Sequence, residues 1–176
     1  MIELKKGDIF LTTNNKWLGK SIRKAQKIID SSDPIEFSHG GIVLDENGEI
    51  FESVAKISKN NINKYIGEKI LIARHQEMTD FKFERGLAAI EKYEGKIYPF
   101  WRLPLFFVGL ADNLYFLDWP VCTELCHIFC LGAGIKTGIK KHGKNHWAGT
   151  SPDMFEDAIQ SRNDLWTVIY KGKLEK

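Results

Sequence analysis

Two short apolar stretches on either side of Asn47-Gly48 constrain the fold of this chain more than any other feature. The stretches run from about residue 39 to 44 and from about 49 to 54. An Asn-Gly pair between two such stretches is the strongest short-range signal of a β-hairpin, because these residues accept the positive φ angles of tight turns. We therefore expect an antiparallel pair of strands in the first third of the chain.

The rest of the chain predicts more strands and helices without a linker between them. Strands cluster between helices instead of alternating with them, which favours an α+β fold with an antiparallel sheet. No repeat or Gly/Ser/Pro-rich segment divides the 176 residues, so one domain over 1–176 is the simplest expectation. The periodicities predict strands over 8–13, 69–75 and 165–170, and helices over about 16–30, 80–94, 122–131 and 152–160, with Gly132 ending the third helix.

Cys122 stands at the predicted first turn of a helix. A thiol in that position meets the positive end of the helix dipole and unpaired N–H groups, and both favour the nucleophilic thiolate. The simpler interpretation is a small buried apolar residue, which is the usual environment of a free cysteine. Cys126 and Cys130 follow at helical spacing on one stripe of the helix. We expect these two to pack in the core.

His39 and Glu52 come from the two strands of the predicted hairpin, and the length of its loop decides whether they meet. With a loop of Asn47-Gly48 alone, the two side chains share a face but lie roughly 13 Å apart. With a loop from Asp45 to Gly48, Glu52 becomes a diagonal neighbour of His39, within reach of long side chains. An imidazole oriented by a carboxylate is a suitable base for a thiol. A functional site therefore requires the longer loop or a bulge.

Two other histidines are weaker candidates for a base. His127 lies five residues beyond Cys122 on the same predicted helix, which turns it away from the thiol. His75 ends a predicted strand and has no carboxylate at a comparable offset. We expect His75 to be a partly exposed polar residue at the end of its strand.

Five short motifs, in this order, resemble the circularly permuted branch of the NlpC-type papain-like cysteine hydrolases, the YiiX-like proteins. In that branch the histidine strand precedes the cysteine helix. The resemblance runs from Gly7 to about residue 153, and the chain departs from it at Pro99 and in the apolar stretch 100–110. The motifs are Gly7-Asp8-Ile9-Phe10, Ser38-His39-Gly40-Gly41-Ile42-Val43, Phe51-Glu52-Ser53, Gly95-Lys96-Ile97-Tyr98 and Val121-Cys122-Thr123-Glu124-Leu125.

The resemblance implies a permuted papain-like fold, in which an antiparallel sheet or barrel packs against the nucleophile helix. It implies a thiol hydrolase that cleaves an amide bond in a small peptide, a cell-wall fragment or an amino-acid conjugate. Cys122 would be the nucleophile, His39 the base and Glu52 the residue that orients the base. Tyr98 would lend its hydroxyl to the oxyanion or the substrate, or else pack in the core.

Two other functions remain open. The apolar stretch 100–110 could line a pocket for a lipid, which suits an acyltransferase or thioesterase similar to lecithin:retinol acyltransferase. The third alternative is a binding module that keeps the fold without catalysis. The net charge of +2 argues neither for nor against nucleic acid, and we predict no nucleic-acid partner. The oligomeric state stays open.

We predict neither a metal nor a cofactor. Structural zinc sites usually take closely spaced pairs of cysteine and histidine, whereas Cys122 and Cys130 are about 12 Å apart along a helix. Three cysteines form no disulfide framework and favour a reducing compartment. The first residues lack an apolar signal segment, and the run from Leu103 to Ala111 is too short to span a membrane. A cytoplasmic protein without an integral membrane segment is therefore expected.

Overall fold

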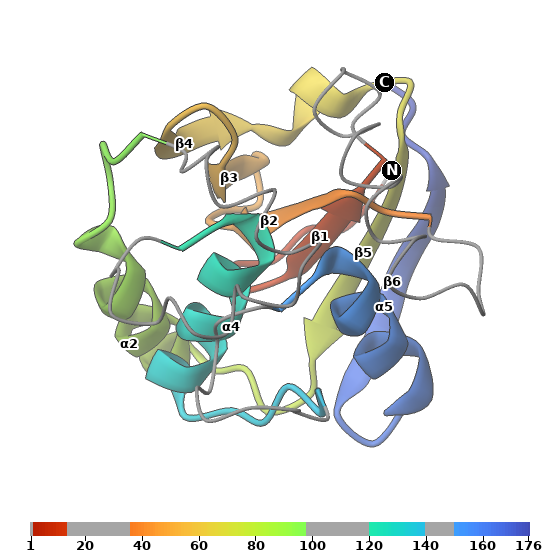
Figure 1. Ribbon diagram of the computed structural model, residues 1–176. Coiled ribbons are helices and arrows are strands. Elements are labelled where there is room, and N and C mark those ends of the chain that lie inside the picture. Colours follow the sequence, from red (N-terminus) through yellow and green to blue (C-terminus); the bar gives the residue numbers. More distant parts are fainter. Residues whose placement is uncertain (1, 14–35, 98–119, 140–149) are drawn as a thin grey trace, which may run out of the picture.

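A computed structural model describes residues 2–13, 36–97, 120–139 and 150–176 (Figure 1). The predicted helix over 16–30, Tyr98 and the apolar stretch 100–110 lie outside these residues. Within them, the elements in chain order are β1 (Ile9–Thr12), β2 (His39–Val43), β3 (Glu49–Ser53), β4 (Ile57–Asn61), the 3-10 helix η1 (Ile62–Tyr65), β5 (Lys69–His75), α2 (Asp80–Glu91), α4 (Cys122–Ala133), α5 (Pro152–Ser161) and β6 (Trp166–Lys173).

The strands form a single six-stranded sheet in the order β4-β3-β2-β1-β5-β6. Every neighbouring pair of strands is antiparallel. This arrangement confirms the α+β class and the antiparallel sheet. The resemblance implied either an antiparallel sheet or a barrel. The described residues form a sheet, with β4 and β6 at its edges.

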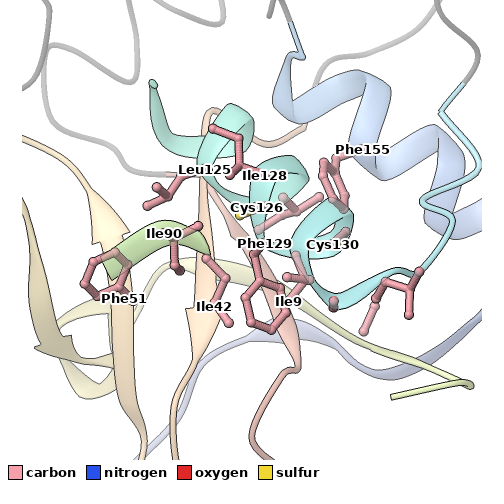
Figure 2. Packing of buried hydrophobic residues seen from close by; sticks show 14 of the residues in the cluster. Ile9, Ile42, Phe51, Ile90, Leu125, Cys126, Ile128, Phe129, Cys130 and Phe155 are labelled. Atoms are coloured by element: carbon pink, nitrogen blue, oxygen red, sulfur yellow. The ribbon is translucent and has the colours of Figure 1, made fainter. Parts of the chain in front are cut away.

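The main hydrophobic core lies between the sheet and the helices α2, α4 and α5. Side chains from the three helices meet Ile9, Ile42 and Phe51 of the sheet, and all of these residues are buried (Figure 2). A second, smaller cluster of buried residues, which includes Phe10 and Tyr65, lies on the opposite face of the sheet. Burial of this much apolar surface, at about 25 cal/mol per Å², is the main force that holds the helices on the sheet. The predicted core positions of Cys126 and Cys130 are confirmed, because both are fully buried.

Strand β4 was not predicted from the sequence. Its residues, Ile-Ser-Lys-Asn-Asn, are mostly polar, and only Ile57 is fully buried. Hydrogen bonding to β3, with Ser53 opposite Ile57, gives the segment its strand conformation. The strand is therefore a product of pairing at the sheet edge and not of a hydrophobic pattern.

The predicted end of the nucleophile helix at Gly132 was wrong. Helix α4 continues to Ala133 and ends at Gly134, whose φ of 70° is the left-handed conformation that glycine adopts without strain. Gly132 instead serves the packing of α4 on α2, because a Cβ atom at that position would lie 2.5 Å from the Cβ of Ala89. A residue without a side chain thus allows the two helices to approach closely.

None of the helices in the described part of the chain has the length and apolar character that a membrane span requires.

Candidate active site

Cys122 is the first residue of α4, and its side chain is buried. The residues around it fix this end of the helix. The backbone N–H of Val121 donates to the Glu124 carboxylate, Oε2, at 2.9 Å. The Thr123 hydroxyl donates to the Thr150 carbonyl oxygen at 2.7 Å. The thiol therefore stands at a well-anchored helix N-terminus, where the dipole of α4 favours a negative charge.

His39 opens β2, where it pairs with Thr12 of β1. Its ring lies against two aromatic rings, with centroid distances of 6.1 Å to Phe10 and 5.9 Å to Tyr65. Its side chain is hydrogen-bonded to Glu52 and interacts with the side chain of Cys122. The contact with Glu52 joins His39 Nε2 and Glu52 Oε2 at 2.8 Å. The imidazole therefore bridges the thiol and the carboxylate.

The glycine that follows His39 lets α4 come close to β2. A Cβ atom at Gly40 would lie 2.8 Å from Leu11 Cδ2, 3.0 Å from the Phe10 carbonyl oxygen and 3.2 Å from Thr123 Cγ2. Real Cβ atoms essentially never come as near as 2.8 Å, and the two longer distances are tighter than most real Cβ contacts. A side chain at this position would push the start of α4, and with it the thiol, away from the histidine strand.

The loop between β2 and β3 has the longer of the two predicted lengths. The N–H of Leu44 donates to the Glu49 carbonyl oxygen at 2.7 Å, so that the loop comprises residues 45–48. Gly41 therefore faces Glu52, and Glu52 is the diagonal neighbour of His39. The structure confirms the register in which the two side chains meet.

Three donors surround the buried carboxylate of Glu52. Tyr65 donates its hydroxyl to Oε2 at 2.5 Å, the same oxygen that contacts His39. Lys64 donates its ammonium group to Oε1 at 2.5 Å. Burial alone would raise the pKa of Glu52, but the hydrogen bond and charge of His39, with the donors Lys64 and Tyr65, lower it to about 2. Glu52 is thus ionised near neutral pH.

The same contacts decide the charge of His39. Burial favours the neutral ring, but the hydrogen bonds to Cys122 and Glu52 outweigh it and raise the pKa of His39 to about 9. An ionised carboxylate can only accept hydrogen bonds, so Nε2 is the donor to Glu52. With Nε2 committed to Glu52, Nδ1 is the ring nitrogen that remains for the thiol. The arrangement can hold a thiolate beside an imidazolium, which is the form of a cysteine that attacks carbonyl groups.

The other sequence candidates lie outside this cluster. His127 Nδ1 contacts the Thr150 hydroxyl at 3.1 Å. Burial raises the pKa of Cys126 and of Cys130, which keeps both as neutral thiols. Tyr98, the predicted substrate-binding residue, lies outside the described residues.

The prediction of a partly exposed His75 was wrong. His75 is buried, with Nε2 3.0 Å from the Lys136 carbonyl oxygen, and its Nδ1 accepts the N–H of Glu77 at 3.2 Å. Its ring packs on Trp166 with a centroid distance of 4.8 Å. This end of β5 is covered because His75 pairs with Trp166, the first residue of β6.

Sequence reasoning missed Lys64 and Tyr65. Asn61, a residue that favours helix N-caps, precedes them and does cap η1, but a short polar segment carries no signal of a catalytic neighbourhood. Their contact with Glu52 arises only because β4 returns along β3 and brings η1 beside it. A tertiary path of this kind cannot be read from spacing in the chain.

The fold and this cluster define an α+β protein in which a cysteine at a helix start faces a histidine and a carboxylate from one hairpin. Among solved structures, YiiX from Escherichia coli O157:H7, described as a metalloprotein of the DUF1105 group, is similar to this chain. The TM-score is 0.65, the sequence identity is 19%, and the match covers 96% of this chain and 98% of that chain. The likeness shows a shared fold and agrees with the YiiX-like part of the sequence resemblance. No protein-family model matches the chain, and no curated protein does.

The description of YiiX as a metalloprotein belongs to that protein. In the part of this chain that the structure describes, no group of three His, Cys, Asp or Glu side chains is arranged to hold a metal ion. The three cysteines are free thiols.

Proposed function

We propose that this protein is a thiol hydrolase of the permuted papain-like, NlpC-type kind, which cleaves an amide bond through Cys122, His39 and Glu52. The substrate class is a small peptide, a cell-wall fragment or an amino-acid conjugate. One observation supports the proposal above the others. The buried His39 side chain interacts with a thiol at a helix N-terminus on one side and is hydrogen-bonded to a buried carboxylate on the other.

The chemistry follows from the charges of these three groups. The Cys122 thiolate attacks the carbonyl carbon, and a C–S bond forms as the carbonyl oxygen becomes an oxyanion. The backbone N–H of Cys122, at the start of α4, helps to stabilise that oxyanion. The His39 imidazolium then gives its proton to the leaving nitrogen, and the amine departs from a thioester on Cys122.

Hydrolysis of the thioester restores the enzyme. Neutral His39 takes a proton from a water molecule, which attacks the thioester carbonyl, and the acid product leaves as the C–S bond breaks. Glu52 holds the imidazole in one orientation and stabilises its charged form throughout. The same steps would cleave an ester or a thioester. If another acceptor took the place of water, the acyl group would be transferred to that acceptor. The thioesterase alternative therefore differs from the proposal in the bond that is cleaved, and the lipid acyltransferase alternative differs also in the acceptor of the acyl group.

A thiol-labelling experiment tests the proposal against a non-catalytic binding module. The native protein is treated with a limiting amount of iodoacetamide near neutral pH, and the adducts are located by peptide mass. We expect Cys122 to react first and the Cys122→Ala variant to lose the fast reaction. Preferential labelling of Cys126 or Cys130 would refute the assignment.

The substrate class needs a separate measurement. Wild-type protein and the Cys122→Ala control are incubated with matched amide, ester and thioester substrates that carry peptide or lipid acyl groups. We expect the amides of amino acids and small peptides to be cleaved by the wild type alone. Turnover restricted to lipid esters or thioesters would instead favour the acyltransferase-like alternative.

A further inference from the structure

Lys64 and Tyr65 are consecutive residues that occupy both oxygens of the buried Glu52 carboxylate. Lys64 Nζ lies 2.5 Å from Oε1, and the Tyr65 hydroxyl lies 2.5 Å from Oε2. Lys64 Nζ also lies 5.3 Å from the centroid of the Tyr65 ring. The Tyr65 ring and hydroxyl are buried, whereas the Lys64 side chain is one-third exposed, at 34%. The carboxylate is thus held from one side by a charge and from the other by a dipole.

The element that carries these two residues is fixed to the catalytic hairpin. The N–H of Ile62 donates to the Gly48 carbonyl oxygen at 2.8 Å, and Asn61 Nδ2 donates to the Asn47 carbonyl oxygen at 3.2 Å. The Asn61 side chain also caps η1 by accepting the N–H of Asn63 at 2.9 Å. Because η1 is tied to the β2–β3 loop, its donors keep a constant position relative to Glu52.

Among Cys122, His39, Glu52 and Lys64, the charges balance only when Lys64 is included. A thiolate, an imidazolium and a carboxylate carry one net negative charge in a buried site. The ammonium group of Lys64 brings that sum to zero. An uncompensated buried charge is costly, and a missing partner destabilises the groups that remain. The Tyr65 hydroxyl adds a fixed donor that limits how much of the carboxylate charge reaches His39.

We propose that Lys64 and Tyr65 are positioning residues of the thiol site, which fix the orientation of the Glu52 carboxylate and set the pH range over which the Cys122–His39 pair is active. The inference rests on the proposed function, since it concerns the same thiol. Neither residue has to touch the substrate, because each acts through Glu52.

A purely structural role is the competing explanation. Tyr65 and Lys64 could simply fasten η1 to the sheet, in which case their loss would lower stability and leave the pH range unchanged. The pH profile separates the two explanations. The charged or titratable groups that face this cluster come from β2, β3, η1, α4 and the segment after η1, and they are His39, Glu52, Lys64, Tyr65, Cys122 and Glu68.

The experiment measures the rate of Cys122 alkylation by iodoacetamide from pH 4 to pH 10. The variants are Lys64→Met, Lys64→Arg and Tyr65→Phe, and each adduct is located by peptide mass. Lys59→Met on the exposed side of β4 controls for the loss of a lysine charge, and Tyr170→Phe controls for the loss of a tyrosine hydroxyl. Thermal unfolding of every variant reports whether it folds.

Removal of a nearby positive charge makes every neighbouring acid hold its proton more tightly. We therefore expect Lys64→Met to move the limbs of the profile to higher pH by about 1 unit, as a unit charge in a partly buried site does. Tyr65→Phe should move them in the same direction by less, because this substitution removes a dipole and not a charge. Lys64→Arg and the two controls should keep the wild-type profile.

A profile of Lys64→Met and Tyr65→Phe that superimposes on the wild type would overturn this inference and leave the proposed function intact. A wild-type Cys122 that reacts no faster than a free cysteine would instead refute the proposed function. If Lys64→Met does not fold, an NMR titration of the His39 ring in Tyr65→Phe decides the question. A midpoint shifted to higher pH supports the proposal, and an unchanged midpoint contradicts it.

Discussion

His39 Nε2 lies 2.8 Å from Glu52 Oε2, and the contact depends on a four-residue loop between two short strands. A two-residue loop in the same sequence would have left these side chains on one face of the hairpin but too far apart to touch. The loop length is held by Asp45, whose side chain accepts the N–H of Glu49 at 2.8 Å, and by Gly48 with a φ of 84°. The geometry of the loop therefore decides whether the imidazole has a carboxylate partner.

The first prediction concerns the charge of Glu52. Glu52→Gln keeps a hydrogen-bonding side chain but removes the negative charge that stabilises the His39 imidazolium. We expect turnover of a confirmed amide substrate to fall on the order of 10- to 1000-fold, less than the near-total loss in Cys122→Ala. The alkaline limb of the pH–rate profile of Glu52→Gln should also lie at lower pH than that of the wild type, because the pKa of His39 would drop. If Glu52→Gln turned over the substrate at the wild-type rate from pH 5 to 9, the catalytic site would consist of Cys122 and His39 alone.

The second prediction concerns stability at alkaline pH. The pKa of His39 in the folded protein is raised to about 9, above its ordinary value of 6.5. Its charged form therefore stabilises the fold fully below pH 6.5, and that stabilisation is lost as the pH rises through about 9. We expect the free energy of unfolding of the wild type to decline over this range. His39→Gln, which cannot titrate, should give a flatter curve in urea titrations at pH 6, 7.5 and 9. Parallel curves for the two proteins would contradict the prediction.

The third prediction concerns acid and the buried His75. Burial lowers the pKa of His75 below 6.5, and its Nδ1 is occupied as an acceptor of the Glu77 N–H. The neutral ring thus stabilises the fold above pH 6.5, and this contribution is lost as the pH falls through the lower folded-state pKa. We expect wild-type stability to decline as the pH falls below 6.5. His75→Gln should be less stable near neutral pH and should decline less on acidification. Equal acid sensitivity in both proteins would count against this role.

The fourth prediction concerns Ser53, a buried residue that follows Glu52. Its hydroxyl has no hydrogen-bond partner among the described residues. Removal of a buried, unsatisfied polar group is neutral or stabilising, so Ser53→Ala should raise the free energy of unfolding by about 1 kcal/mol. Ser58→Ala on the neighbouring strand is the control, because the Ser58 hydroxyl accepts the Asn60 amide at 3.2 Å. A loss of stability in Ser53→Ala would mean that its hydroxyl has a partner in solution.

The fifth prediction concerns the close approach at Gly40. A methyl group there meets the Phe10 carbonyl oxygen at 3.0 Å, and this backbone atom cannot move aside easily. We expect Gly40→Ala to cost about 1–3 kcal/mol of stability and to slow the alkylation of Cys122. Gly134→Ala is the comparison, since its φ is 70° but nothing lies within 4 Å of a Cβ atom there. It should cost about 1 kcal/mol without slowing alkylation. Equal alkylation rates in both variants would contradict the steric argument.

Much of the fold could be predicted because its signals are local. The Asn47-Gly48 turn predicted the hairpin. Thr79 and Ser151, which are residue types that favour N-caps, stand directly before α2 and α5, and both side chains accept backbone N–H groups there. Strand β4 escaped prediction because its polar residues become a strand only beside β3. The end of α4 was misplaced because Gly132 serves helix packing, a tertiary property that a helix-stop rule does not contain.

The candidate site likewise has residues that could be predicted from the sequence and residues that could not. The positions of Cys122 at a helix start and of His39 and Glu52 on paired strands followed from motif and parity. The donors on η1 did not, because nothing in a linear sequence shows that residues 64 and 65 return to the side of Glu52. The catalytic roles, the absence of a cofactor and the cytoplasmic location remain predictions.

The arrangement of the site along the chain has a consequence for its assembly during folding. His39, Glu52 and the η1 donors all lie between residues 39 and 65, whereas the thiol belongs to α4, far along the chain. Contacts within a short segment close small loops, and small loops cost little entropy and form early. The base and its carboxylate can therefore come together while Cys122 is still an ordinary thiol on an unfolded segment. In the proposed enzyme, Cys122 therefore gains its base only when α4 packs beside the hairpin.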